Sequence, residues 1–502
     1  MAPADPEVST SAGRVRGRIE KGVAVFRGIP FAKPPIGPLR FQAPEPPAPW
    51  DGVRDAKEFG PAAPQATMMA AAPGQPGPPA DTTGEWLTAN VWTPDPAATR
   101  LPVMVWIYGG AYMFGASSEA GYDGTVFARG GAVFVSLNYR IGTEGFALLP
   151  GAPANRGLLD AVAALTWVKD NVEGFGGDPA NVTVFGESAG AGVIAAMLAM
   201  DGAKGLFKRA IAQSVPGSFF TRELATNVGH AIARQAGLPY TYEALAAADP
   251  SDLANAQMAL TARMKEFPQW GGLSLCVTPF SPVIDGEVLP RSPWRALLAG
   301  AAAEVELLTG HNRDEYRLFV AMGGLLGNVT EDEAAAALAT FAPAPDGPAD
   351  YKKAFPDADP SGMYELIFSD WLFRMPTLHL AQAHAASGGR TFLYELAAEA
   401  PAGPFGACHG LDVPLLFGAT GPGRTAMLTG ENPPAEFVAL GDTMRREWLA
   451  FAANGDPGWP AYGTEHRTTR VYDLQPDVVS YPEETSMRLW ERHRFDALGV
   501  PA

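Results

Sequence analysis

The 502-residue sequence predicts an α/β protein built around a central, twisted and mostly parallel sheet. Short β-rich runs that are apolar on both faces alternate along the chain with longer runs whose apolar residues recur at helical spacing. Strands covered by helices on both faces have this continuous apolar pattern. The strand-like runs are residues 103–108, 132–138, 182–185, 305–310 and 391–396, and a clear helical run spans residues 157–172.

Length and composition indicate a large core. Hydrophobic residues make up 47% of the chain. Length alone would suggest several domains, but large α/β enzymes often exceed the usual domain size without dividing. We therefore expect residues 1–502 to form a single domain, with helical insertions in the α/β body.

Charge, apolar runs and cysteine content argue against a nucleic-acid-binding protein, a membrane protein and a disulfide-linked fold. The chain carries 37 basic and 54 acidic residues, a formal net charge of -17, and such a field repels nucleic acids and anionic lipid surfaces. No basic segment followed by an apolar run opens the sequence, and no stretch offers about 18 uninterrupted apolar residues. The two cysteines, Cys276 and Cys408, are too few for a disulfide framework. We expect a soluble, cytoplasmic protein.

A serine between two glycines is the strongest chemical signal in the sequence. Residues 181–200 read NVTVFGESAGAGVIAAMLAM, in which Ser188 lies between a strand-like run and an alanine-rich helical run. A strand that turns sharply into a helix through Gly-x-Ser-x-Gly exposes the hydroxyl of a nucleophilic serine. The flanking strand and helix favour this interpretation over an ordinary turn.

A serine nucleophile needs a histidine base and an acid that orients the base. Among the seven histidines, His409 is the best candidate, because FGACHGLDVPLLFG surrounds it with small residues of a loop. For the acid, Asp314 and Glu315 follow a predicted strand, and Asp412 lies three residues beyond His409. The pattern of residues alone does not choose among these three carboxylates.

A glycine-rich turn should supply the backbone N–H groups that bind a developing oxyanion. The segment WIYGGAYMFG (106–115) provides such a turn after a predicted strand, with Gly109, Gly110 and Ala111 at its centre.

These motifs together resemble the type-B carboxylesterase family, which includes bacterial para-nitrobenzyl esterases and cholinesterases. The resemblance covers nearly the whole chain in order, and its segments include NYRIGTEGF, GGDPANVTVFGESAGA, LFKRAIAQSV, HNRDEY and HGLDVPLLFG. It implies the α/β-hydrolase fold, with helical insertions that form the rim of an active-site gorge.

The resemblance also implies roles for individual residues. The family's triad corresponds to Ser188, Glu315 and His409, and its oxyanion hole to the N–H groups of Gly110, Ala111 and Ala189. Two further implied features are a supporting serine, Ser214, and a structural ion pair between Arg140 and Asp160.

Several positions depart from the family pattern. Trp86 replaces a cysteine that forms a disulfide in the animal enzymes, and Tyr316 replaces the glycine that usually follows the triad acid. Leu318 stands where cholinesterases have an aromatic residue. Without aromatic rings that could stack on a quaternary ammonium group, a cholinesterase activity is disfavoured.

The predicted function is therefore hydrolysis of short- to medium-chain or aryl carboxylic esters through an acyl-enzyme intermediate, with no cofactor and no metal. The expected partner is a small-molecule ester, and a monomer is compatible with the sequence. Alternatives are an amide or carbamate hydrolase with the same triad and a non-catalytic binding protein. Candidates for an apolar substrate pocket are Tyr108, Tyr112, Phe114, Phe219, Phe220 and Phe319.

Overall fold

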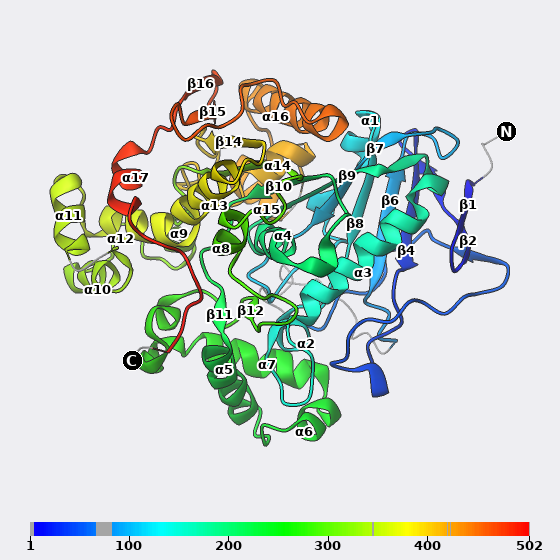
Figure 1. Ribbon diagram of the computed structural model, residues 1–502, viewed down its shortest axis with the longest axis horizontal. Helices are drawn as coiled ribbons and strands as arrows, with labels where there is room; N and C mark the ends of the chain where they lie inside the picture. The colour runs from blue at the N-terminus through cyan, green and yellow to red at the C-terminus, as the bar shows by residue number, and fades with distance from the viewer. Residues whose placement is uncertain (1–4, 67–82, 344–345, 419, 422, 501–502) are drawn as a thin grey trace.

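A computed structural model of the chain describes residues 5–66, 83–343, 346–418, 420–421 and 423–500. An 11-stranded sheet runs through the molecule and is flanked by helices (Figure 1). This arrangement confirms the predicted α/β class.

The strand order of this sheet is β16-β15-β14-β13-β10-β9-β7-β8-β6-β4-β3. Its strands are β3 (Arg18–Glu20), β4 (Val23–Pro30), β6 (Thr88–Thr93), β7 (Leu101–Ile107), β8 (Val133–Leu137), β9 (Gly177–Glu187), β10 (Arg209–Gln213), β13 (Glu306–Asn312), β14 (Thr391–Leu396), β15 (Thr468–Tyr472) and β16 (Asp477–Ser480). Two smaller sheets contain β1 (Glu7–Thr10), β2 (Gly13–Arg16) and β5 (Val53–Asp55), and β11 (Phe220–Thr221) with β12 (Val283–Ile284).

The central part of the sheet is parallel. Every neighbouring pair from β8 across to β15 is parallel, whereas the pairs toward β3 and the β15–β16 pair are antiparallel. The register places Ile211 of β10 beside Phe185 of β9 and Leu308 of β13. The five strand-like runs of the sequence lie on β7, β8, β9, β13 and β14, as predicted, and almost all of their residues are buried.

The helices are α1 (Thr125–Arg129), α2 (Gly142–Phe146), α3 (Arg156–Asn171), α4 (Ala189–Ala199), α5 (Arg222–Gln235), α6 (Tyr242–Ala247), α7 (Pro250–Thr261), α8 (Pro293–Leu298), α9 (Arg317–Met322), α10 (Glu331–Phe341), α11 (Gly347–Ala354), α12 (Pro360–Ser369), α13 (Met375–Ala386), α14 (Asp412–Phe417), α15 (Arg424–Thr429), α16 (Ala435–Asn454) and α17 (Glu484–Trp490). A π-helical turn, Asp370–Arg374, joins α12 to α13.

Most of the extra helices lie in two insertions. Helices α5, α6 and α7 are grouped at the bottom of Figure 1, and α10, α11 and α12 at its left. The first group lies in sequence between β11 and β12, and the second between β13 and β14. Helix α4 belongs instead to the core: it is apolar on all sides, packs on β9 and β10, and is almost entirely buried.

Among the described residues, no helix combines the length and the apolar character needed to cross a bilayer. Both cysteines are free: Cys408 is buried and Cys276 is partly buried.

Candidate active site

The predicted site residues lie at one edge of the parallel sheet. Carboxyl ends of parallel strands meet at the same edge, which is where α/β proteins form their sites. The turn at Gly109 follows β7, and the next strands in spatial order are followed by Ser188, Ser214, Glu315 and His409. Residues up to 300 positions apart in sequence thus come together at one place.

Ser188 occupies a strained turn between β9 and α4. Its backbone angles, φ 59° and ψ -125°, are rare for a residue with a side chain, and its side chain is only half-buried. The two flanking glycines are needed because β7 runs close by. A Cβ at Gly186 would lie 2.5 Å from the carbonyl oxygen of Ile107, and one at Gly190 would lie 2.0 Å from the same atom.

A chain of hydrogen bonds links the three triad candidates. Nε2 of His409 lies 2.8 Å from Oγ of Ser188, and Nδ1 lies 2.6 Å from Oε2 of Glu315. An ionised carboxylate can only accept a hydrogen bond, so Nδ1 carries the proton and Nε2 is free to accept the serine hydroxyl. This is the tautomer that a general base requires.

The carboxylate of Glu315 is itself held on its other oxygen. Oε1 accepts hydrogen bonds from Oγ of Ser214 at 2.5 Å and from the backbone N–H of Asn312 at 2.9 Å. Burial alone would raise the pKa of Glu315. The charge and hydrogen bond of His409, together with the donors Ser214 and Asn312, outweigh burial and lower that pKa, so Glu315 stays ionised.

The other two carboxylates left open by the sequence have different partners. Oδ2 of Asp314 accepts from the backbone N–H of Ala407. Oδ2 of Asp412 accepts from Nε2 of Gln213 at 2.7 Å and from the hydroxyl of Tyr394 at 3.0 Å. Only Glu315, of the three, is hydrogen-bonded to His409.

A second carboxylate, which no sequence motif indicated as part of the site, reaches His409 from the serine side. Oε1 of Glu187 lies 3.1 Å from Nε2 of His409. Burial raises the pKa of Glu187 to about 7, against the opposing charges of His409 and Arg424. For His409, burial lowers the pKa, but the carboxylates of Glu187 and Glu315 outweigh it and the net pKa is raised. The only signal in the sequence was that Glu187 adjoins the serine.

The predicted oxyanion turn lies beside Ser188 and contains unpaired donors. Gly110, Ala111 and Tyr112 all have positive φ, at 104°, 56° and 59°. Among the described residues, no acceptor binds the N–H groups of Gly110, Ala111 or Ala189. A Cβ at Gly109 would lie 3.0 Å from Cβ of Ser188, so the turn approaches the serine closely. Unpaired backbone N–H groups in a turn beside a serine are the type of donor that binds an oxyanion.

The aromatic pocket candidates differ in exposure. Phe114 and Phe319 are half-buried, and the ring of Phe319 lies 5.4 Å from that of His409. The remaining four side chains are at most 2% exposed and pack in the core: Tyr108, Tyr112, Phe219 and Phe220.

The structural ion pair is present and fully buried. Arg140 donates from Nη2 to Oδ1 of Asp160 at 2.7 Å, and neither side chain is exposed. A backbone N–H and Nε of Arg140 also donate to the other carboxylate oxygen. The pair joins the loop after β8 to α3.

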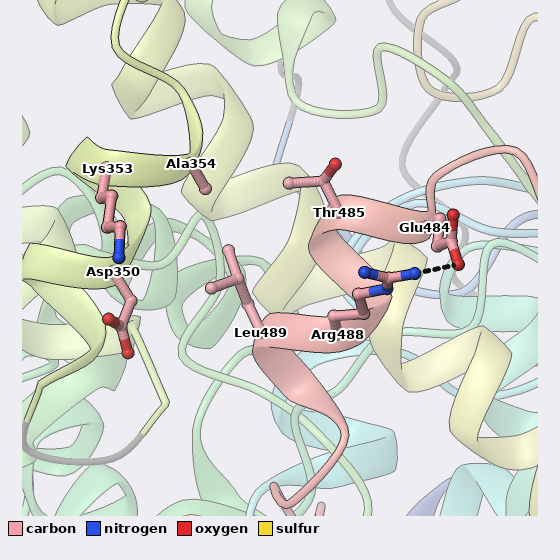
Figure 2. A pocket seen from close by; sticks show the side chains of 7 residues that line it. All are labelled: Asp350, Lys353, Ala354, Glu484, Thr485, Arg488 and Leu489. Carbon is pink, nitrogen blue, oxygen red and sulfur yellow. Dashed lines mark hydrogen bonds and ion pairs between the residues drawn. The ribbon is translucent and has the colours of Figure 1, made fainter.

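A separate hollow of about 530 Å³ lies between α11 and α17 (Figure 2). Acidic and basic side chains line it in equal number, and Arg488 pairs with Glu484 along α17 at 2.7 Å. No triad residue contributes to its wall. Over the part of the chain that the structure describes, no group of three or more histidine, cysteine and acidic side chains could hold a metal ion.

Comparison with known proteins identifies the family. A model of the carboxylesterase family matches residues 4–490. The chain is 36% identical over 495 residues to the para-nitrobenzyl esterase of Bacillus subtilis (strain 168), covering 95% of this chain and 96% of that protein. The chain belongs to the carboxylesterase family. The family model, the esterase relative and the solved carboxylesterase structures show that the chain has the α/β-hydrolase fold and is a carboxylic ester hydrolase. Both predictions from the sequence are thereby confirmed.

Other relatives of this carboxylesterase are hydrolases named for different substrates. A fumonisin B1 esterase of Sphingopyxis macrogoltabida is 33% identical, over 91% of this chain and 85% of that protein. A phenmedipham hydrolase of Pseudarthrobacter oxydans is 32% identical, over 96% of this chain and 99% of that protein. Among solved structures, a carboxylesterase of Geobacillus stearothermophilus superposes with a TM-score of 0.84 at 34% identity, covering 96% of this chain and 99% of that one.

Proposed function

We propose that this carboxylesterase hydrolyses short- to medium-chain or aryl carboxylic esters with Ser188 as nucleophile, His409 as general base and Glu315 as the orienting acid. The observation that carries the proposal is the unbroken line of hydrogen bonds from Ser188 through His409 and Glu315 to Ser214. The para-nitrobenzyl esterase relative and the half-buried rings of Phe114 and Phe319 support an apolar or aryl ester as substrate.

In the first half-reaction, Oγ of Ser188 attacks the ester carbonyl while Nε2 of His409 takes its proton. The carbonyl oxygen becomes an oxyanion, which the N–H groups of Gly110, Ala111 and Ala189 bind. Each such donor contributes about 3 kcal/mol to transition-state stabilisation. The intermediate collapses, Nε2 returns the proton to the alcohol oxygen, and the acyl-enzyme remains.

In the second half-reaction, water replaces the alcohol. Nε2 of His409 removes a proton from the water as its oxygen attacks the acyl carbon. When the bond between the acyl carbon and Oγ breaks, Nε2 returns that proton to Oγ of Ser188, and the carboxylic acid leaves. Glu315 remains ionised throughout and stabilises the imidazolium through Nδ1. No step requires a cofactor.

The test is hydrolysis of para-nitrophenyl acetate, butyrate and octanoate at pH 7.5 by the wild type and by Ser188→Ala. We expect the variant to lose several orders of magnitude in kcat, and the wild-type chain-length preference to describe the acyl pocket. Equal, slow rates for both proteins would refute the proposed triad. A matched anilide measured in parallel separates an esterase from an amide hydrolase, because the amide requires proton transfer to a leaving nitrogen.

A further inference from the structure

One face of the His409 imidazole is covered by an aromatic ring that the mechanism above does not use. The ring of Phe373 is stacked on that of His409, with centroids 4.1 Å apart and planes inclined by 27°. Phe373 is only 3% exposed. A second ring, Phe319, lies nearly parallel to Phe373, at an inclination of 10° and 6.2 Å away. The base thus packs against a small aromatic stack.

Phe373 lies in the π-turn between α12 and α13. A π-turn holds one more residue than a turn of α-helix, which changes the direction of its side chains, and such turns occur often at functional sites. Within this turn, Arg374 pairs with Asp370 at 3.0 Å and with Glu483 at 2.7 Å. These pairs hold the charged end of the turn, while Phe373 contacts the imidazole.

The helical segment around this turn is hydrogen-bonded to the two loops that carry Glu315 and Ser214. Oγ of Ser369 accepts from the backbone N–H of Tyr316, the residue after Glu315, at 2.9 Å. The carbonyl oxygen of Leu372 accepts from the N–H of Gly217 at 2.7 Å, three residues beyond Ser214. The position of Phe373 is therefore set by the same segment that contacts the loops of Glu315 and Ser214.

Stacking can do what the two hydrogen bonds of His409 do not. Bonds at Nδ1 and Nε2 hold two edges of the imidazole but leave it free to tilt about the line between them. A flat side chain against one face restricts that tilt. The face of a benzene ring also attracts a cation, so the stack favours the imidazolium over the neutral ring.

We propose that Phe373 is a positioning residue for the general base: its ring fixes the tilt of His409 and stabilises the imidazolium formed when Ser188 loses its proton. The proposal rests on the proposed triad. Changing Phe373 leaves in place the other charged groups that face His409, which are Glu187, Glu315, Asp412 and Arg424. Nη2 of Arg424 donates to the carbonyl oxygen of His409 at 3.2 Å. Asp370 and Arg374 pair with each other within the π-turn.

The experiment compares Phe373→Leu with Phe341→Leu. The control removes a ring of the same kind, since Phe341 stacks on Trp371 of the same π-turn at 4.1 Å and 30° but does not touch His409. We expect Phe373→Leu to lower kcat about tenfold for acetate and butyrate esters alike, with little change in KM. The acid limb of its kcat/KM profile should move to lower pH by about 0.5, which corresponds to a roughly threefold lower proton affinity of His409. Phe341→Leu should change neither quantity.

Two results would overturn the proposal. If Phe373→Leu alters only KM or chain-length preference and leaves the acid limb in place, Phe373 is a pocket wall. If Phe341→Leu has the same effect, the loss reflects general packing. Should Phe373→Leu fail to fold, Phe373→Tyr keeps the ring and should keep the wild-type profile, whereas Phe373→Met should shift it. Ser188→Ala measured alongside separates a failure of the triad itself from a failure of this role.

Discussion

Replacing Glu315 by Gln tests the triad most sharply, because the structure dictates how the new amide must lie. Oε1 of Glu315 accepts from two donors, the hydroxyl of Ser214 and the backbone N–H of Asn312. The backbone N–H can only donate, so an acceptor must lie opposite it. The amide oxygen of the glutamine must take this place. Its NH2 group then occupies the position of Oε2, which lies 2.6 Å from Nδ1 of His409.

This orientation imposes the wrong tautomer on the base. An NH2 group facing Nδ1 donates to it, so the imidazole proton moves to Nε2 and the ring can no longer accept the proton of Ser188. The equivalent Asp-to-Asn change in another serine hydrolase lowers kcat about 10⁴-fold, which is roughly 5.4 kcal/mol of transition-state stabilisation. We expect a loss of that order in Glu315→Gln, with KM little changed because the two side chains have nearly the same shape.

The assay is steady-state hydrolysis of para-nitrophenyl butyrate, with circular dichroism to confirm folding. Asp412→Asn is the matched control, because Asp412 is equally buried and near His409 but accepts only from Gln213 and Tyr394. Its other oxygen has no partner among the described residues and can be replaced by an NH2 group. If Glu315→Gln loses less than about tenfold, or Asp412→Asn loses as much as Glu315→Gln, the assignment of the acid is refuted.

Three further results follow from the same contacts. Activity should fall as pH drops through the raised pKa of His409, with a midpoint above about 6.5. Glu187→Gln should move this midpoint to lower pH, because a charge that favours the imidazolium is lost. An unmoved midpoint would contradict that role of Glu187. Ser214→Ala should lower kcat about tenfold with KM unchanged, since the acid loses one of its donors; a change confined to KM would argue against this. Asp160→Asn should lower the free energy of unfolding by about 3 kcal/mol in denaturant titrations, because Arg140 is left buried and unpaired, and an unchanged midpoint of unfolding would show that the pair is dispensable.

Local sequence was sufficient for the features that one strand, one helix or one turn determines. Continuous apolar runs indicated β7, β8, β9, β13 and β14, and helical spacing over residues 157–172 indicated α3 to within one residue at each end. The Gly-x-Ser-x-Gly motif likewise indicated the turn at Ser188, since strand, glycines and helix are contiguous there. In each case the pattern follows from burial or backbone sterics within a few neighbouring residues.

The choice of the triad acid shows what spacing could not decide. Asp314, Glu315 and Asp412 were equivalent candidates by position, and resemblance to a family was needed to select Glu315. The structure separates them by direction: adjacent carboxylates at the end of β13 point to different partners, one to Ala407 and the other to His409. Which way a loop side chain points depends on the packing of several strands, and no local pattern encodes it.

Contacts between distant segments were decided by the tertiary structure alone. Glu187, Phe373 and Arg424 converge on His409 from three different elements. Only Glu187 carried any signal in the sequence, because it adjoins Ser188. The sequence by itself determined five strands of the central sheet, the helices α3 and α4, the nucleophile turn and, through resemblance, the family. The surroundings of the base required the fold, because parallel strand order and a π-turn bring together side chains that are hundreds of residues apart.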